Sequence, residues 1–369
     1  MPVTCALVVL LILAISGCAE RYETPDLPPV ARPEAQAQER PVRLVAVGDV
    51  LLADAVQEKL DEFGYRYPLR QLRGLVAGHD LLIGNLEGPI TDHAEPISSK
   101  KDFVYKMDAQ AAIALRDFGF DLFDLANNHV LDYGMDGMRD TWQALDRMGI
   151  GHFGSGLDLD EAIHGKIVEV AGLRIGFLGF MQRWSGYVSD YPFYAQEGVP
   201  GVPLATPKVL KAAIVPMRDK VDTLVVSFHW GRNYSDVRAN QVRMGRLAVD
   251  LGADLVIGHN SHNLQGVEIY RQVPILYSLG NFTFGTTGRF DTMADPLWQH
   301  GWVADIKIAK GRAAEVALIP IATNNLVVDF QPRPADPALL EDILALVNRK
   351  FDTRLQVTGG RAIWALEGQ

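Results

Sequence analysis

The segment Leu44-Val45-Ala46-Val47-Gly48-Asp49 runs from apolar residues into a carboxylate, and this arrangement indicates how the chain folds. An apolar run that ends in polar residues is typical of a strand in a parallel sheet, whose carboxyl edge is the usual place for ligands in open α/β folds. Further segments of similar kind follow in order: Gly84-Asn85-Leu86-Glu87, Ala126-Asn127-Asn128-His129, Phe228-His229-Trp230-Gly231 and Gly258-His259-Asn260-Ser261-His262. They predict an α/β fold that gathers polar side chains where its strands end.

Apolar strands alternate with amphipathic helical segments in the first half of the chain. Strands are predicted at residues 43–47, 80–84 and 120–126. Asp108 has the right side chain to cap a helix that ends before Gly119, and a second helix is predicted from Met135 to Met148. This alternation indicates βαβ units.

The second half of the chain repeats this order and adds pairs of strands joined by short turns. The pairs are 167–170 with 174–180, 266–270 with 273–278, and 302–308 with 314–319. Crossovers and hairpins together predict two mixed sheets that face each other with helices outside, a four-layer α/β/β/α sandwich. Residues 42–323 form this predicted domain, with a loop over the site at 181–220. Residues 324–369 are predicted to be a C-terminal extension with one helix at 338–350.

Length, hydrophobic content and net charge limit the classes of protein to which this chain can belong. A chain of 369 residues with 48% hydrophobic residues can bury a full core, as one large α/β domain or two smaller ones. The net charge of -10 and the pI near 5.4 disfavour nucleic acid as a partner, because phosphate backbones favour clustered Lys and Arg and the sequence has no such cluster.

The first residues are predicted to direct export. The apolar run from Ala6 to Ile15 is too short to cross a bilayer but has the size of a signal-peptide core, and Ile15-Ser16-Gly17-Cys18 resembles a bacterial lipobox. Residues 1–17 are therefore a predicted signal peptide, Cys18 a predicted lipidation site and residues 18–41 a flexible tether. The protein is then expected at the cell envelope, anchored to a membrane by lipid and facing the periplasm or exterior. The alternative is a mistranslated start with a fortuitous cysteine.

The polar residues at the predicted strand ends are of the types that bind divalent metals. Each segment alone has an ordinary explanation, such as a turn or a buried histidine bonded to a backbone carbonyl. The chain nevertheless places four of its nine histidines at these junctions, beside Asp49, Asn85 and Glu87. With no cysteine ligand left after processing, this mixture argues against a structural zinc site. It favours an open Mn, Fe or Zn site with one or two ions.

The order of these motifs resembles the CapA family, the capsule or poly-γ-glutamate synthesis proteins, which are similar to calcineurin-like metallophosphoesterases. The resemblance covers roughly residues 43–284 and also includes Asp132-Tyr133-Gly134 and Tyr277-Ser278-Leu279-Gly280-Asn281-Phe282. It implies a metallophosphatase-like fold. It also implies the metal ligands Asp49, Glu87, Asn128, His229, His259 and His262, with His129 as a general acid near the leaving group.

The sequence departs from the superfamily pattern at two places. Leu51 stands where the superfamily has a metal-binding histidine, so one ion has lost a ligand and the number of ions, one or two, stays open. Either Asn85 or Glu87 corresponds to the carboxylate that bridges two ions. A neutral amide would bridge cations poorly, so Glu87 is the predicted ligand.

The resemblance also suggests substrate-binding cations. Lys106 lies where the family often has an arginine ahead of a helix, and Arg232 follows the motif around His229. Lys100, Lys101 and Arg183 are further cations close to the motifs. For each of them the ordinary explanation is a solvated surface charge.

Three functions remain open on this basis. The first is a metal-dependent hydrolase of the cell envelope that acts on poly-γ-glutamate or another envelope polymer. The second is a non-catalytic, polymer-binding accessory factor for capsule synthesis or export, which the loss of a ligand at Leu51 favours. The third is a general metal-dependent phosphoesterase. The expected partners are the polymer, the membrane through the lipid anchor and capsule-synthesis proteins.

Overall fold

The computed structural model describes residues 40–93, 95–97, 101–184, 193–287, 296–349, 351, 353 and 355–365. The predicted signal peptide, the lipidation site Cys18 and nearly all of the tether lie outside these residues, as does Lys100. Within them, every helix is too short or too polar to cross a bilayer.

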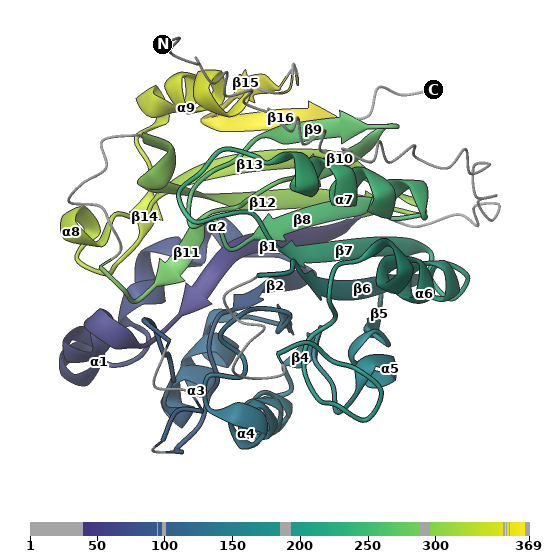
Figure 1. The fold of residues 1–369 in the computed structure, drawn as a ribbon. Helices are drawn as coiled ribbons and strands as arrows, with labels where there is room; N and C mark the ends of the chain where they lie inside the picture. Colours follow the sequence, from purple (N-terminus) through teal and green to yellow (C-terminus); the bar gives the residue numbers. More distant parts are fainter. Residues whose placement is uncertain are drawn as a thin grey trace, which may run out of the picture.

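The first sheet has ten strands, and β1 lies in its interior between β12 and β2 (Figure 1). Its parallel part consists of β1, β2, β3, β4 and β11, and antiparallel strands continue it on the other side of β1. The parallel strands are β1 (Val42–Leu51), β2 (Leu81–Leu86), β3 (Leu122–Asp124), β4 (Gly151–Phe153) and β11 (Asn281–Phe284). The antiparallel strands are β12 (His300–Ala309), β13 (Arg312–Ala322), β14 (Arg333–Pro334), β15 (Gln356–Thr358) and β16 (Arg361–Ala365).

The second sheet has six strands in the order β5-β6-β7-β8-β10-β9. Its strands are β5 (Lys166–Val170), β6 (Leu173–Met181), β7 (Thr223–His229), β8 (Leu255–His259), β9 (Val267–Tyr270) and β10 (Val273–Leu276). The four central strands are parallel, and β5 and β9 are antiparallel at the edges. Both sheets are mixed, and the three hairpins predicted from the sequence are confirmed.

Three apolar cores show that the two sheets face each other between layers of helices. Alternate residues of β1 point to opposite faces, because side chains alternate along a strand: Leu44 joins the core between the sheets, whereas Val45 joins the outer core. The helices against that outer core are α1 (Gln57–Phe63), α2 (Arg73–Val76), α3 (Ala109–Phe118) and α4 (Gly134–Arg147). The second sheet packs against α6 (Pro207–Arg218) and α7 (Ala239–Asp250). The predicted four-layer sandwich is confirmed.

The predicted helices α3 and α4 are also confirmed. Asp108 caps α3 by accepting a hydrogen bond from the backbone N–H of Gln110 at 2.8 Å, and Gly119 ends it in the left-handed conformation. Two short helices, α5 (Leu159–Ala162) and α8 (Asn325–Val328), lie in connections.

The prediction of a loop throughout residues 181–220 is wrong in its last third. Residues 207–218 form α6, which Thr206 caps by accepting from the N–H of Val209. Pro207 is compatible with this helix because it occupies the first turn, where a helix needs no N–H, whereas Pro216 lies inside the helix.

The segment after residue 324 contributes to the first sheet. Its helix α9 (Leu340–Val347) packs on the core between the sheets, and β16 pairs with β13. Only a helix is predicted here from the sequence. Strands β14, β15 and β16 are too short to give a clear sequence pattern, so they were not predicted.

Candidate metal centre

The strands of both sheets that carry the sequence motifs end at one place, where their polar side chains form a buried cluster. Asp49 comes from β1, Glu87 directly follows β2, and His229 ends β7. One ligand atom from each of these residues lies within 4.8 Å of the others, and each residue is buried. With Asn128, His129, His259 and His262, which contact these residues, this cluster is the candidate metal centre.

Glu87 stands at the middle of the candidate metal centre. Its Oε1 lies 3.7 Å from Nε2 of His229, 3.7 Å from Nε2 of His262 and 4.0 Å from Nε2 of His129. These separations are too long for hydrogen bonds, and Oε1 is buried with no hydrogen-bond partner in the described part of the chain. Three ring nitrogens therefore surround a carboxylate oxygen without touching it.

Asp49 connects the cluster to the loop after β8. Its Oδ1 lies 3.3 Å from Nδ1 of His259, and its Oδ2 lies 3.2 Å from Nδ1 of His262. The backbone N–H of Asn260 donates to Oδ2 at 3.3 Å. Asn281, at the start of β11, accepts a hydrogen bond at 2.9 Å from Nδ1 of His262 and so orients the ring.

Two asparagines hold the carboxylates in place. The amide Nδ2 of Asn85 donates to Asp49 Oδ1 at 2.9 Å and to Glu87 Oε2 at 3.2 Å. Its Oδ1 accepts from Asn127 at 3.1 Å. The amide of Asn85 thus bridges the two carboxylates, whereas Oε1 of Glu87 has no donor among the described residues.

The turn after β3 supplies an amide and an imidazole. Asn128 Oδ1 accepts from Nε2 of His229 at 2.7 Å, which links the two sheets across the centre. His129 Nδ1 donates to Oδ2 of Asp132 at 2.7 Å, so its Nε2 is left to face Glu87. The ring of Tyr105 packs on that of His129, with centroids 4.3 Å apart.

Burial and neighbouring charges shift the pKa values of the centre in opposite directions. Burial raises the pKa of Glu87 well above its usual value, and Asp49 adds to this effect. Burial would also raise the pKa of Asp49, but His259 and His262 outweigh it and lower that pKa. Burial lowers the pKa of His229. For His262 the charges of Glu87 and Asp49 outweigh burial and raise the pKa to about 9.

These residues fit a divalent cation. Besides Glu87 Oε1, the buried Nδ1 of His229 has no hydrogen-bond partner among the described residues, and Nδ1 of His259 has only the 3.3 Å approach to Asp49 Oδ1. Buried polar atoms in native proteins are almost always hydrogen-bonded, so several orphaned atoms in one cluster call for an explanation. The mixture of carboxylate, imidazole and amide suits Mn, Fe or Zn, and the six predicted ligands lie together.

Two glycines allow the motifs to approach so closely. A Cβ added to Gly48 would overlap the carbonyl oxygen of Gly280, which also accepts the N–H of Asp49 at 3.0 Å. A Cβ added to Gly258, just before His259, would meet the carbonyl oxygen of Tyr277 and the indole of Trp230. Trp230 stacks on Phe228 beneath the centre, with ring centroids 4.3 Å apart.

The structure places the two predicted substrate-binding cations at the surface. Lys106 is exposed, donates to the carbonyl oxygen of His93 at 2.8 Å and lies over the ring of Tyr133. Arg232 is exposed on the loop after β7. Sequence reasoning noted Lys101 only as a cation close to the motifs, with a solvated surface charge as its ordinary explanation, whereas the structure shows it largely buried and in contact with the turn around His129. It also gave no role to Asp132, although its spacing of three residues from His129 is a usable signal for a His–Asp pair.

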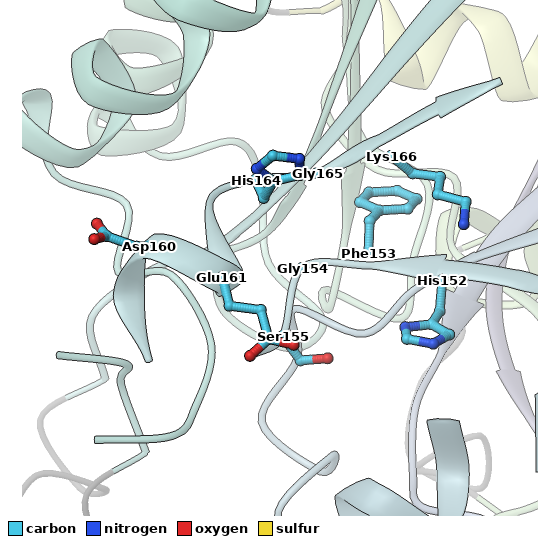
Figure 2. A pocket seen from close by; sticks show the side chains of 9 residues that line it. All are labelled: His152, Phe153, Gly154, Ser155, Asp160, Glu161, His164, Gly165 and Lys166. Carbon is cyan, nitrogen blue, oxygen red and sulfur yellow. The ribbon is translucent and has the colours of Figure 1, made fainter. Parts of the chain in front are cut away.

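A separate cavity of about 440 Å³ lies at the end of β4, and it includes none of the ligands of the candidate metal centre (Figure 2). His152, His164 and Lys166 line it together with Asp160 and Glu161, and Phe153 lies at its wall. The cavity is therefore lined by both acidic and basic side chains, and this mixture favours neither an anionic nor a cationic ligand.

Comparisons with known proteins agree on one family. Residues 43–286 match the family model described as bacterial capsule synthesis protein PGA_cap. The PGA biosynthesis protein CapA of Bacillus subtilis (strain 168) is 32% identical over 241 residues, which are 64% of this chain and 62% of that protein. The capsule biosynthesis protein CapA of Bacillus anthracis is 30% identical over 68% of this chain and 62% of that protein. The chain thus spans less than two thirds of the length of these two relatives.

A third relative is matched over more of its length. It is named a probable polyglutamine synthesis accessory protein, from Mycobacterium tuberculosis (strain ATCC 25618 / H37Rv). It is 28% identical over 334 residues, which cover 87% of this chain and 86% of that protein. Among solved structures, purple acid phosphatase PPD1 from yellow lupin seeds matches 77% of this chain and 52% of its own, with 9% identity and a TM-score of 0.35. That likeness is too low to carry an argument.

Proposed function

Because the chain belongs to the family of bacterial capsule synthesis proteins described as PGA_cap, we propose that it binds a divalent cation in the candidate metal centre and hydrolyses a bond in an envelope polymer such as poly-γ-glutamate. The observation that carries the proposal is the buried cluster of Asp49, Glu87 and His229. In this cluster Oε1 of Glu87 has no hydrogen-bond donor among the residues that the structure describes. The names of the Bacillus relatives support the class of polymer.

We assign the ligand set to Asp49, Glu87, Asn128, His229, His259 and His262. A bound Mn, Fe or Zn ion would supply Lewis-acid polarisation of the scissile group. One ion suits the chain better than two. Leu51, where the superfamily has a histidine ligand, is fully buried in the apolar core and has no atom that can bind a metal.

His129 contributes through its free ring nitrogen. Burial lowers the pKa of His129 to about 4, and the neighbouring Lys101 acts in the same direction. The ring is then neutral at pH 7, with its proton on Nδ1 towards Asp132. We therefore propose that Nε2 accepts a proton from the nucleophile, in place of the general-acid role implied by the resemblance.

The experiment compares metal content and hydrolysis in wild-type protein, Glu87→Gln and His229→Ala. We expect about one ion per chain in the wild type by elemental mass spectrometry and far less in the variants. Release of fragments from poly-γ-glutamate should fall roughly a thousandfold, since a catalytic metal provides several kcal/mol of transition-state stabilisation. The matched control is His164→Ala, an exposed histidine of the cavity in Figure 2, which should leave both quantities unchanged. Full activity of Glu87→Gln would refute the proposal.

A second candidate is a non-catalytic, polymer-binding accessory factor for capsule synthesis or export. The apolar Leu51 in a ligand position favours it, and the relative from Mycobacterium tuberculosis is named an accessory protein. Under this hypothesis the wild-type protein retains metal and binds polymer without cleaving it. Turnover of p-nitrophenyl phosphates with no effect on polymer would instead indicate a general phosphoesterase.

We also propose that the protein is exported and anchored to a membrane through lipid on Cys18. The apolar run before Cys18 and the lipobox-like ending support this proposal. Labelling cells with a radioactive fatty acid should mark the wild-type protein and leave Cys18→Ser unlabelled. Equal labelling of the two proteins, or none in the wild type, would contradict the anchor.

A further inference from the structure

Lys101 is a largely buried cation that contacts the turn carrying two residues of the candidate metal centre. Its side chain is only 11% exposed. The ammonium donates to the backbone oxygen of Asn128 at 2.6 Å and forms an ion pair with Oδ1 of Asp132. It also lies 3.2 Å from Nδ1 of His129 and 5.6 Å from the centroid of the Phe193 ring.

Two contacts of Lys101 involve groups that flank His129. The backbone oxygen of Asn128 belongs to the residue directly before His129. The carboxylate of Asp132 accepts a hydrogen bond from Nδ1 of His129. Asp132 Oδ2 accepts, in addition, the backbone N–H of Tyr105 at 2.8 Å. Since Nδ1 already donates to Asp132, the approach of Lys101 to that nitrogen is a close contact between donors and not a hydrogen bond. The oxygens of Asn128 and Asp132 are therefore the acceptors that hold the ammonium against this turn.

A buried ammonium is costly to desolvate and is found where partners compensate it. Burial lowers the pKa of Lys101, in agreement with its position away from solvent. Lys106, five residues later, is exposed, donates to the carbonyl oxygen of His93 and lies over the ring of Tyr133. The two lysines therefore belong to one segment but differ in what they touch.

We propose that Lys101 is a positioning residue of the candidate metal centre. Through Asn128 O and Asp132, its ammonium locks the turn so that Asn128 Oδ1 faces His229 and His129 Nε2 faces Glu87. It acts on both the ligand and the proton acceptor without touching the site of the cation. The inference rests on the proposed function of the centre as a cation site.

The test measures Mn²⁺ affinity of the full-length chain by electron paramagnetic resonance titration, which needs no turnover. Lys101→Met removes the ammonium while nearly keeping the side-chain length, and the affinity should fall roughly 10- to 100-fold, the usual effect of losing an outer-shell partner. Lys101→Arg keeps a cation that can donate to the same oxygens and should recover most of the affinity. Lys106→Met, the matched control, should bind Mn²⁺ as the wild type does.

Wild-type affinity in Lys101→Met would overturn the proposal, and so would an equal loss in Lys106→Met, which would indicate a general effect of net charge. Circular dichroism and thermal melting check that each variant folds. Should Lys101→Met fail to fold, Lys101→Gln takes its place, because its amide can still donate to Asn128 O. A wild type that binds Mn²⁺ but cleaves no polymer would refute the hydrolase proposal alone, since the comparison of affinities still decides the role of Lys101.

Discussion

Glu87 shows at the scale of one residue why the centre calls for a cation. Burying a carboxylate oxygen without a donor costs several kcal/mol, and such groups usually take up a proton or bind a metal instead. In the metal-free protein burial favours the first response, because it raises the pKa of Glu87 above its usual value. A cation among the surrounding ring nitrogens would remove the need for that proton.

The metal-free protein should lose stability as the pH rises from about 6.5 to 9. The folded-state pKa of His262 is raised to about 9 by Glu87 and Asp49, so protonated His262 stabilises the fold below the unfolded-state value and ceases to do so through pH 9. The difference corresponds to at most about 3 kcal/mol. Urea unfolding in chelator at pH 6 and pH 9 measures it. The slope should be much smaller in His262→Gln, and an equal slope in both proteins would show that other groups control this range.

The sequence identified the residues that make up the candidate metal centre but not the contacts that orient them. Asp49, Glu87 and His259 could be predicted because each follows an apolar strand, a local pattern that the sequence displays directly. Lys101 follows no periodic segment, and its importance comes from contacts 27 and 31 residues away. Only the folded chain brings these groups together.

At the scale of elements, strong local signals were read correctly. Helix α3 has a capping aspartate, an apolar face and a terminal glycine, so its bounds could be predicted almost to the residue. Helix α6 was missed because its prolines suggested a loop, although Pro207 stands at the one end of a helix that tolerates it. The strand β16 was missed because its five residues alternate only weakly and depend on β13 for their hydrogen bonds.

At the scale of the whole molecule, the centre lies across the two sheets. Asp49, Glu87 and Asn128 belong to strands or strand ends of the first sheet, and the histidines 229, 259 and 262 belong to those of the second. A cation bound by both groups would link the sheets where the apolar core between them ends.

Metal should therefore stabilise the fold as a whole. With free Mn²⁺ at a hundred times its dissociation constant, mass action predicts about 2.7 kcal/mol of added stability. Calorimetry with Mn²⁺ and then with excess chelator should show a matching fall in Tm for the wild type and almost none for Glu87→Gln. An equal response in both proteins would place the stabilising ion elsewhere.

The pairing of β1 with β12 has a consequence for synthesis. About 260 residues separate these neighbours, so at typical ribosome speeds β12 is synthesised roughly 13 to 52 s after β1. During that interval a nascent polypeptide cannot close its larger sheet, so one apolar edge stays uncovered. This delay before β12 can pair with β1 would allow a protein-translocation complex to bind the chain while it is unfolded. Without such a complex, the same delay allows the uncovered strand to aggregate.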